Sequence, residues 1–149
     1  MKSIAPIAFA AASLLALCQQ AQAQSPAAVH DHVSAAPVGA PKFDAKGIAR
    51  TETVRSEFDS TREAIQVRVD FAAGASFPKH SHPGVEIAYV LNGVIEYELN
   101  GKVVRLKAGE SIYIPAGAVH SAKNVGAGIT SELATYLVEK NKPIVILDK

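Results

Sequence analysis

Apolar and polar residues alternate along several stretches of the chain after residue 64. Between residues 65 and 72, apolar side chains occupy every second position, and the same alternation recurs between residues 94 and 99. Because successive side chains of a β-strand point to opposite faces, this period of two predicts strands with one buried face. In the second of these strands we expect Ile95, Tyr97 and Leu99 to point inward.

Glycine, asparagine and proline separate these stretches and predict turns. Asn-Gly pairs at 92–93 and 100–101 are each flanked by apolar runs, which is a strong signal for a two-residue β-hairpin. We therefore expect residues 86–91, 94–99 and 102–107 to form a tight antiparallel meander. Further short strands are predicted at 111–114, 119–125, 130–138 and 143–147. This many short strands, without a long helical period, predict an all-β sandwich or barrel.

The first 23 residues differ in composition from the rest of the chain. Lys2 supplies a positive charge, residues 4–17 form an apolar run, and Ala21-Gln22-Ala23 places small residues at a cleavage signal. This three-part pattern is typical of a secretory signal peptide, with cleavage after Ala23. The apolar run is shorter than the roughly 20 residues that a membrane-spanning helix needs. We therefore predict that residues 1–23 are a signal peptide and that the protein is periplasmic or secreted.

Residues 24–50 are rich in alanine and proline and show no sustained period. This composition is interpreted as a flexible arm that precedes a folded domain at residues 51–149. The arm contains His30 and His32, which are either an auxiliary metal-binding pair or two solvated histidines. The second interpretation is favoured because no further ligand lies near this pair in the sequence.

Charge and cysteine content limit the possible partners. The chain has 15 basic and 14 acidic residues, and loss of the leader with Lys2 would leave 14 of each. A neutral chain without a basic cluster gives no reason to expect nucleic acid or a membrane surface as a partner. The only cysteine, Cys18, lies in the leader, so the mature protein would form no disulfide.

Candidate metal ligands gather in one short stretch. His80 and His82 are two residues apart, so on a strand their side chains face the same side. A Pro-Gly turn follows them and can bring Glu86 back to that side, and His120 offers a fourth ligand further along. Imidazoles together with a carboxylate are ligands of divalent transition metals. We therefore predict one divalent transition metal; the alternative is a group of core histidines that only satisfy hydrogen bonds.

The spacing of these residues resembles the two motifs of the cupin superfamily. The first motif is similar to Gly74-(x)5-His80-x-His82-(x)3-Glu86-(x)6-Gly93, and the second to Gly109-(x)5-Pro115-x-Gly117-(x)2-His120-(x)3-Asn124. Only 15 residues separate the two motifs, as in a small, single-domain, quercetinase-like cupin. The resemblance covers about residues 65–138. It implies a double-stranded β-helix, the jelly-roll cupin barrel, with His80, His82, Glu86 and His120 as metal ligands.

The resemblance implies a metal without specifying which one. Iron, manganese, nickel, copper, cobalt and zinc all suit mixed imidazole and carboxylate ligands. Four protein ligands would leave two positions of a six-coordinate metal open for substrate or dioxygen. One hypothesis is a metal-dependent dioxygenase acting on a small molecule, in which Glu86 is both a ligand and a proton acceptor. The alternatives are a non-redox isomerase, decarboxylase or lyase, and a non-catalytic periplasmic module that binds a small ligand or the metal.

An apolar row is predicted on the opposite face of the strand that carries Glu86. Ile87, Tyr89 and Leu91 alternate with the positions that face the metal, so they point away from it. Such a row has to be covered by another part of the chain or by another subunit. Since cupins commonly dimerise, we expect a homodimer.

Overall fold

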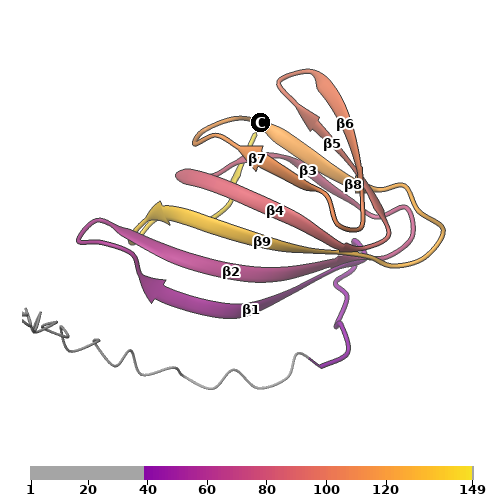
Figure 1. The fold of residues 1–149 in the computed structure, drawn as a ribbon, viewed down its shortest axis with the longest axis horizontal. Helices are drawn as coiled ribbons and strands as arrows, with labels where there is room; N and C mark the ends of the chain where they lie inside the picture. The colour runs from indigo at the N-terminus through magenta and orange to yellow at the C-terminus, as the bar shows by residue number, and fades with distance from the viewer. Residues whose placement is uncertain (1–38, 149) are drawn as a thin grey trace, which may run out of the picture. The chain divides into compact units, whose positions relative to one another are not determined.

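Two five-stranded antiparallel sheets face each other in the folded part of the chain (Figure 1). The computed structural model describes residues 39–148. The first sheet has the strand order β1-β2-β9-β4-β7 and the second the order β10-β3-β8-β5-β6. The strands are β1 (Ile48–Glu57), β2 (Arg62–Phe71), β3 (Ser76–Ser81), β4 (Gly84–Asn92), β5 (Val94–Leu99), β6 (Lys102–Lys107), β7 (Ser111–Ile114), β8 (His120–Asn124), β9 (Thr130–Glu139) and β10 (Ile146–Leu147).

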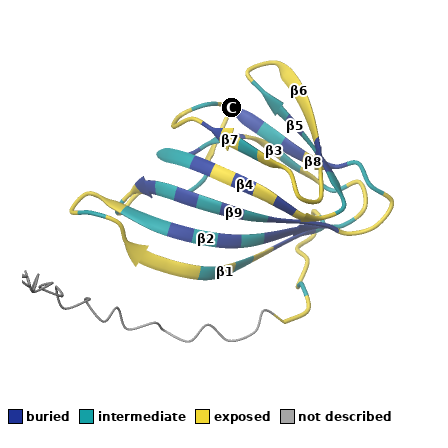
Figure 2. Cartoon of the chain, in the orientation of Figure 1, coloured by how far each residue is buried: buried dark blue, intermediate teal, exposed yellow. Residues whose placement is uncertain are grey.

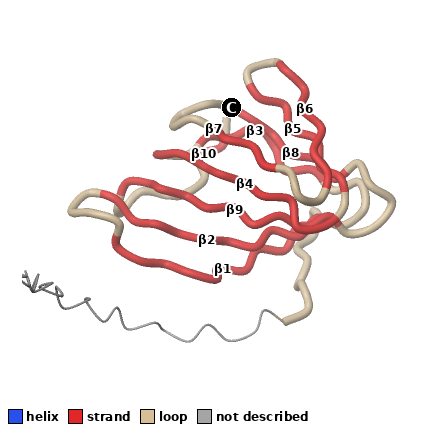
Figure 3. Tube along the Cα trace, viewed as in Figure 1, coloured by secondary structure: helices blue, strands red, loops and turns tan. Residues whose placement is uncertain are grey.

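Loops and turns alone join these strands over residues 39–148 (Figure 3). The predicted all-β jelly-roll class is therefore confirmed. A helix of the length and apolarity that a membrane crossing requires is not found among these residues. The predicted signal peptide and the pair His30 and His32 lie outside the described residues.

The core lies between the two sheets, and the alternation in the sequence determines which side chains fill it. Along β2, every second residue from Ile65 to Phe71 is at most 5% exposed. In β5, Ile95 and Tyr97 are buried and Leu99 is partly buried, as expected. Figure 2 shows a similar banding, with buried residues alternating with exposed ones along β4 and with intermediate ones along β9. Burial of these apolar faces is the main stabilising contribution to such a sandwich.

Strand β1 was missed in the sequence. It begins at Ile48, three residues before the expected start of the folded domain at 51. Ile48 and Ala49 are buried, and β1 pairs with β2 along most of its length. Most residues from Arg50 onward are exposed or half-buried, because β1 lies at the edge of its sheet. An edge strand with so little buried surface carries no clear apolar alternation, so its pairing with β2 defines it.

The predicted three-stranded meander is wrong at its first turn. Strands β5 and β6 do form a hairpin at Asn100 and Gly101, which have φ angles of 51° and 75°. Strand β4 instead pairs with β7 and β9, so Asn92 and Gly93 carry the chain from one sheet to the other. Of these two residues only Gly93 has a positive φ, and a Cβ there would lie 2.3 Å from Thr130 Oγ1. A type I′ turn needs positive φ at both positions, so it does not form here.

Asn124, the last residue of β8, connects several segments at one end of the barrel through hydrogen bonds. Its side chain is buried, and it joins the end of β2, the loop after β8 and the start of β9. Its amide nitrogen donates to the carbonyl oxygens of Phe71, Ala72 and Gly128, and its side-chain oxygen accepts from the Gly126 nitrogen and Thr130 Oγ1. All the hydrogen-bonding capacity of this side chain is used inside the protein.

Candidate metal centre

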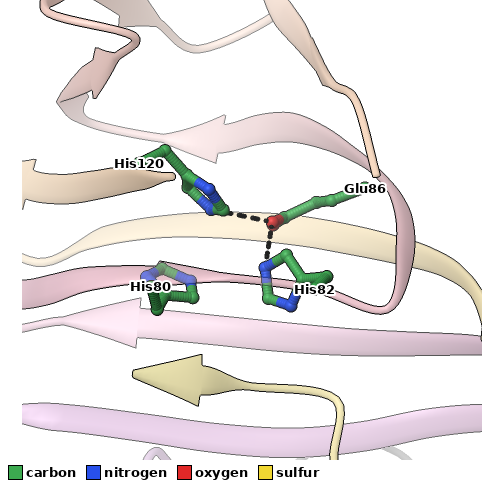
Figure 4. Close-up of side chains that lie close together, drawn as sticks. All are labelled: His80, His82, Glu86 and His120. Carbon is green, nitrogen blue, oxygen red and sulfur yellow. Dashed lines mark ion pairs between the residues drawn. The ribbon is translucent and has the colours of Figure 1, made fainter. Parts of the chain in front are cut away.

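The four predicted metal ligands come together between the sheets (Figure 4). His80 lies on β3, His82 follows that strand directly, Glu86 lies on β4, and His120 begins β8. One potential ligand atom from each of the four lies within 4.8 Å of the others. Each residue is at most 5% exposed. The structure therefore brings together all four residues that the sequence singled out.

Strand pairing and one glycine position these side chains. His80 lies directly opposite His120 in the β3–β8 pair. Between His82 and Glu86 the chain crosses to the other sheet, where Gly84 lies against β9. A Cβ on Gly84 would lie 2.0 Å from the Leu137 carbonyl oxygen, so only glycine allows this approach. The Pro-Gly turn thus returns Glu86 to the histidines, as predicted.

The far side of each imidazole ring is held by a backbone carbonyl. His80 Nδ1 donates to the Pro78 oxygen at 2.8 Å, and His82 Nδ1 to the Ile144 oxygen at 2.5 Å. The third ring, that of His120, donates from Nδ1 to the Ala118 oxygen at 3.0 Å. A carbonyl can only accept, so each neutral ring carries its proton on Nδ1 and has its lone pair on Nε2. This orientation is typical of histidines that bind a metal.

The inner atoms of the cluster have no such partners. Glu86 Oε2 lies 2.8 Å from His82 Nε2 and 3.3 Å from His120 Nε2. With the protons on Nδ1, these Nε2 atoms present lone pairs to the carboxylate, and neither can donate to it. His82 Nε2 and Glu86 Oε2 are both buried without a hydrogen bond. Such atoms cost about 1–3 kcal/mol each, and a cation among them would remove this cost. Three imidazole nitrogens and one carboxylate oxygen fit a divalent transition metal.

The charge states of the cluster suit a cation. Burial lowers the pKa of His80 to about 4, with a further contribution from the neighbouring His120, so His80 is neutral at neutral pH. Burial by itself raises the pKa of Glu86, but the proximity of His120 and His82 lowers it to about 2. Glu86 therefore stays ionised at neutral pH, and its negative charge favours a cation between it and the rings.

Comparison with known proteins agrees with the fold. Residues 67–136 match the protein-family model described as "Cupin domain". Residues 67–136 therefore form a domain of the cupin superfamily. A solved RmlC-like cupin from Shewanella frigidimarina has the same fold, with a TM-score of 0.59 and 22% identity over 75% of this chain and 95% of that one.

Two curated relatives match parts of this cupin. An oxalate oxidase of Triticum aestivum is 34% identical over 103 residues, which cover 60% of this chain and 45% of the relative. An oxalate-binding protein of Thermotoga maritima is 38% identical over 60 residues, which cover 40% of this chain and 50% of the relative. The cupin therefore matches about half the length of each of these relatives.

Sequence reasoning did not identify the buried carboxyl group of Glu132 in the cupin barrel. It points inward from β9 and is 4% exposed, and the Tyr97 hydroxyl of β5 donates to its Oε2. Burial, together with the negative charge of Glu86, raises the pKa of Glu132 to about 8. The signal was present in the sequence: Glu132 shares the alternation of Ala134 and Tyr136, both buried on the inner face.

A small cavity joins Glu132 to the candidate metal ligands. It encloses about 20 Å³, which is room for about one water molecule. Both sheets contribute to its walls. Its lining comprises Arg50, Val69, Phe71, Phe77, His80, Glu86, Tyr97, His120, Ala122, Glu132 and Tyr136.

Proposed function

We propose that the protein is an exported, metal-dependent cupin that oxidises a small molecule with dioxygen, as a dioxygenase does. The observation that carries this proposal is the convergence of three imidazole Nε2 atoms and the Glu86 carboxylate on one buried point. Four protein ligands would leave two positions of a six-coordinate metal for small molecules. A redox-active metal held there supplies the means of activating dioxygen.

The residues of the chain have separate parts in this proposal. His80, His82 and His120 would hold the metal through Nε2, since the carbonyls behind them keep the rings in place. Glu86 would be the fourth ligand, and its ionised carboxylate would become a proton acceptor once released from the metal. The names of the two curated relatives support a small organic ligand, since one is an oxalate oxidase and the other binds oxalate.

Binding without turnover is the second candidate function. The observation in its favour is the enclosed volume of about 20 Å³, which leaves little room for a substrate next to dioxygen. A protein of this kind would hold the metal, or a ligand of a few atoms, in the periplasm. A non-redox isomerase, decarboxylase or lyase would need the same centre with a metal that acts only as a Lewis acid.

Metal content and oxygen consumption test these candidates together. The full chain is expressed with its leader, isolated from the periplasm without chelator or histidine tag, and analysed by mass spectrometry for bound metals. His82→Ala serves as the ligand variant and Lys123→Ala, an exposed residue of β8, as the matched control. We expect near-stoichiometric iron, copper, manganese or nickel in the wild type and control only, and oxygen uptake with a panel of small acids, enols and thiols.

Other results would redirect the proposal. Zinc as the bound metal would favour Lewis-acid chemistry or binding, and a redox metal without oxygen uptake would favour binding alone. The absence of any metal, even after reconstitution, would contradict the metal centre. The N-terminal sequence of the periplasmic product tests export in the same preparation, and we expect it to begin at Gln24.

The homodimer is proposed on the basis of an exposed apolar surface of the first sheet. Ile87, Tyr89 and Leu91 on β4 are 43%, 44% and 44% exposed, and Tyr113 on β7, opposite Ile87, is 57% exposed. Neighbouring apolar side chains of this kind on a sheet face favour association between copies. Light scattering on the purified protein should give the mass of a dimer, and Tyr89→Glu should shift it to the monomer while metal content stays unchanged.

A further inference from the structure

One of the three candidate histidine ligands is held by a distant part of the chain. The rings of His80 and His120 each donate to a carbonyl only two residues earlier in the sequence. His82 Nδ1 instead donates to the carbonyl oxygen of Ile144, which lies 62 residues further along the chain. The orientation of the His82 ring therefore depends on where this later segment docks.

Residues 143–148, here called the strap, form this later segment. The strap contains the two-residue strand β10, which lies at the edge of the second sheet and pairs there with β3, so that Leu147 is opposite His80. It therefore runs beside the strand that leads directly to His82. The match to the cupin domain covers residues 67–136, so the strap lies outside it.

The strap buries little of its own surface. Ile144 packs against the core and is partly buried, Val145 is half-buried, and the other four residues are exposed. Beyond the pairing of β10, the Asp148 nitrogen donates to the Lys79 carbonyl oxygen at 3.0 Å. Segments with so little buried apolar surface open at a lower free energy than core strands do. The strap can therefore detach while the two sheets stay packed.

Detachment of the strap would release the His82 ring. Without the Ile144 oxygen, the proton on Nδ1 loses its acceptor, and the tautomer and the angle of the ring are no longer fixed. The Gly117 nitrogen donates to the main-chain oxygen of His82 at 3.0 Å, which holds the backbone and not the ring. The Tyr136 ring packs at 4.8 Å between centroids and fixes neither ring nitrogen. Hydrogen-bond partners behind a ligating histidine contribute about 10- to 100-fold to metal affinity.

We propose that the strap is a positioning element of the metal centre: when it is docked, the Ile144 carbonyl aims His82 Nε2 at the other candidate ligands, and metal binding in turn holds the strap in place. The inference rests on the candidate metal centre of the proposed function, and it assigns a part to residues outside the matched cupin domain. Such coupling is reciprocal. The factor by which docking strengthens metal binding therefore equals the factor by which the metal stabilises docking.

Titration with Zn²⁺ measures the first of these factors, on the isolated protein after its metal has been removed with a chelator. Wild type is compared with a chain that ends at Lys142 and with Ile146→Pro, because proline has no N–H to give to the pairing with β3. Ile146→Thr is the matched control, since it keeps the N–H at the same exposed position. We expect zinc binding to weaken by about 10- to 100-fold in the truncated chain and in Ile146→Pro, and to stay close to wild type in Ile146→Thr.

Hydrogen–deuterium exchange of peptides that cover the strap measures the second factor. It uses wild type alone, so it does not depend on the folding of any variant. Saturating Zn²⁺ should slow exchange of the strap amides by about the same 10- to 100-fold. Amides of β6, at the opposite edge of the same sheet, are the reference for general stabilisation and should slow less. A strap that only covers the edge of the sheet would not respond to Zn²⁺ more than β6 does.

Two results would overturn the inference and leave the metal centre standing. One is a folded truncated chain, or a folded Ile146→Pro, that binds Zn²⁺ as tightly as wild type. The other is exchange of the strap amides in wild type that Zn²⁺ slows no more than that of β6. A wild type that takes up neither Zn²⁺ nor any other metal on reconstitution would contradict the metal centre and this inference together, so the two failures are distinguishable.

Discussion

The two ends of strand β8 hold two buried polar clusters with opposite hydrogen-bonding states. At its last residue, Asn124, five hydrogen bonds use the whole side chain. At its first residue, His120, the outer ring nitrogen is bonded to a carbonyl, while Nε2 faces Glu86 beside the unbonded atoms of its neighbours. Both residues belong to the same sequence motif and are equally buried. Asn124 is therefore a buried polar group that stabilises the fold, whereas the cluster at His120 has buried polar atoms that are available to a ligand.

Replacing a residue at the His120 end should have the largest effect on metal binding. We expect His120→Ala to weaken metal affinity by at least about 100-fold, since even residues that only support a ligand contribute 10- to 100-fold. The stability of the metal-free protein should change little by comparison, because the variant loses one hydrogen bond and relieves the crowding of lone pairs at Glu86. Metal content and urea unfolding of the chelator-treated protein measure the two effects. If His120→Ala kept its metal, the His120 end of β8 would not be the metal-binding cluster.

The Asn124 end should show the reverse behaviour. Asn124→Ala removes five hydrogen bonds and leaves three carbonyl oxygens without their partner, which should lower the free energy of unfolding by roughly 3–5 kcal/mol. The metal affinity of the folded fraction should stay within a few-fold of wild type. Urea unfolding of metal-free samples measures the loss, with Lys123→Ala as a control on the same strand. A loss below about 1 kcal/mol would indicate that water replaces the lost partners.

The stability of the protein should also depend on pH through the buried carboxyl group of Glu132. Its pKa rises from 4.5 in the unfolded chain to about 8 in the folded protein, so the folded state holds the proton more tightly. This contribution to stability is fully present below pH 4.5 and is lost as the pH rises towards 8. In that window the slope should be about 1.4 kcal/mol per pH unit. The unfolding free energies of metal-free wild type and Glu132→Gln, measured from pH 5 to 9 as a difference, should show it. Parallel curves would contradict a protonated Glu132.

Substitutions at the two Asn-Gly pairs should change the free energy of unfolding least. They directly test the crossover at Asn92 and Gly93. Gly93→Ala should lower the free energy of unfolding by about 1–3 kcal/mol, because the methyl group would meet Thr130 in addition to the unfavourable φ. Gly101→Ala has open space around its Cβ and should cost about 1 kcal/mol for the φ angle alone. Thermal and urea unfolding compare the pair. Equal costs would mean that the contact with Thr130 relaxes.

Much of the fold and of the candidate site could be predicted from the spacing of residues within short stretches of the sequence. The period of two identified β2 and β5 with their inward faces, and the motif spacing identified all four members of the His/Glu cluster. These features depend on alternation along single strands and on turns of a few residues, which the chain encodes locally. The outward row of Ile87, Tyr89 and Leu91 was predicted for the same reason, and the structure places all three on the exposed face.

Pairing between distant segments decided the rest. Whether Asn92 and Gly93 form a hairpin depends on Thr130, which lies 37 residues beyond Gly93 and excludes any other side chain there. Strand β1 is defined by its partner β2, and the place of Arg50 in the cavity wall follows from that pairing. The pKa of Glu132 is raised because the packed strands bury this residue and bring it close to Glu86. The sequence by itself determined the strands, the turns and the four candidate ligands. Burial and contacts across the sheets determined the surroundings of those ligands, because both are properties of the folded chain as a whole.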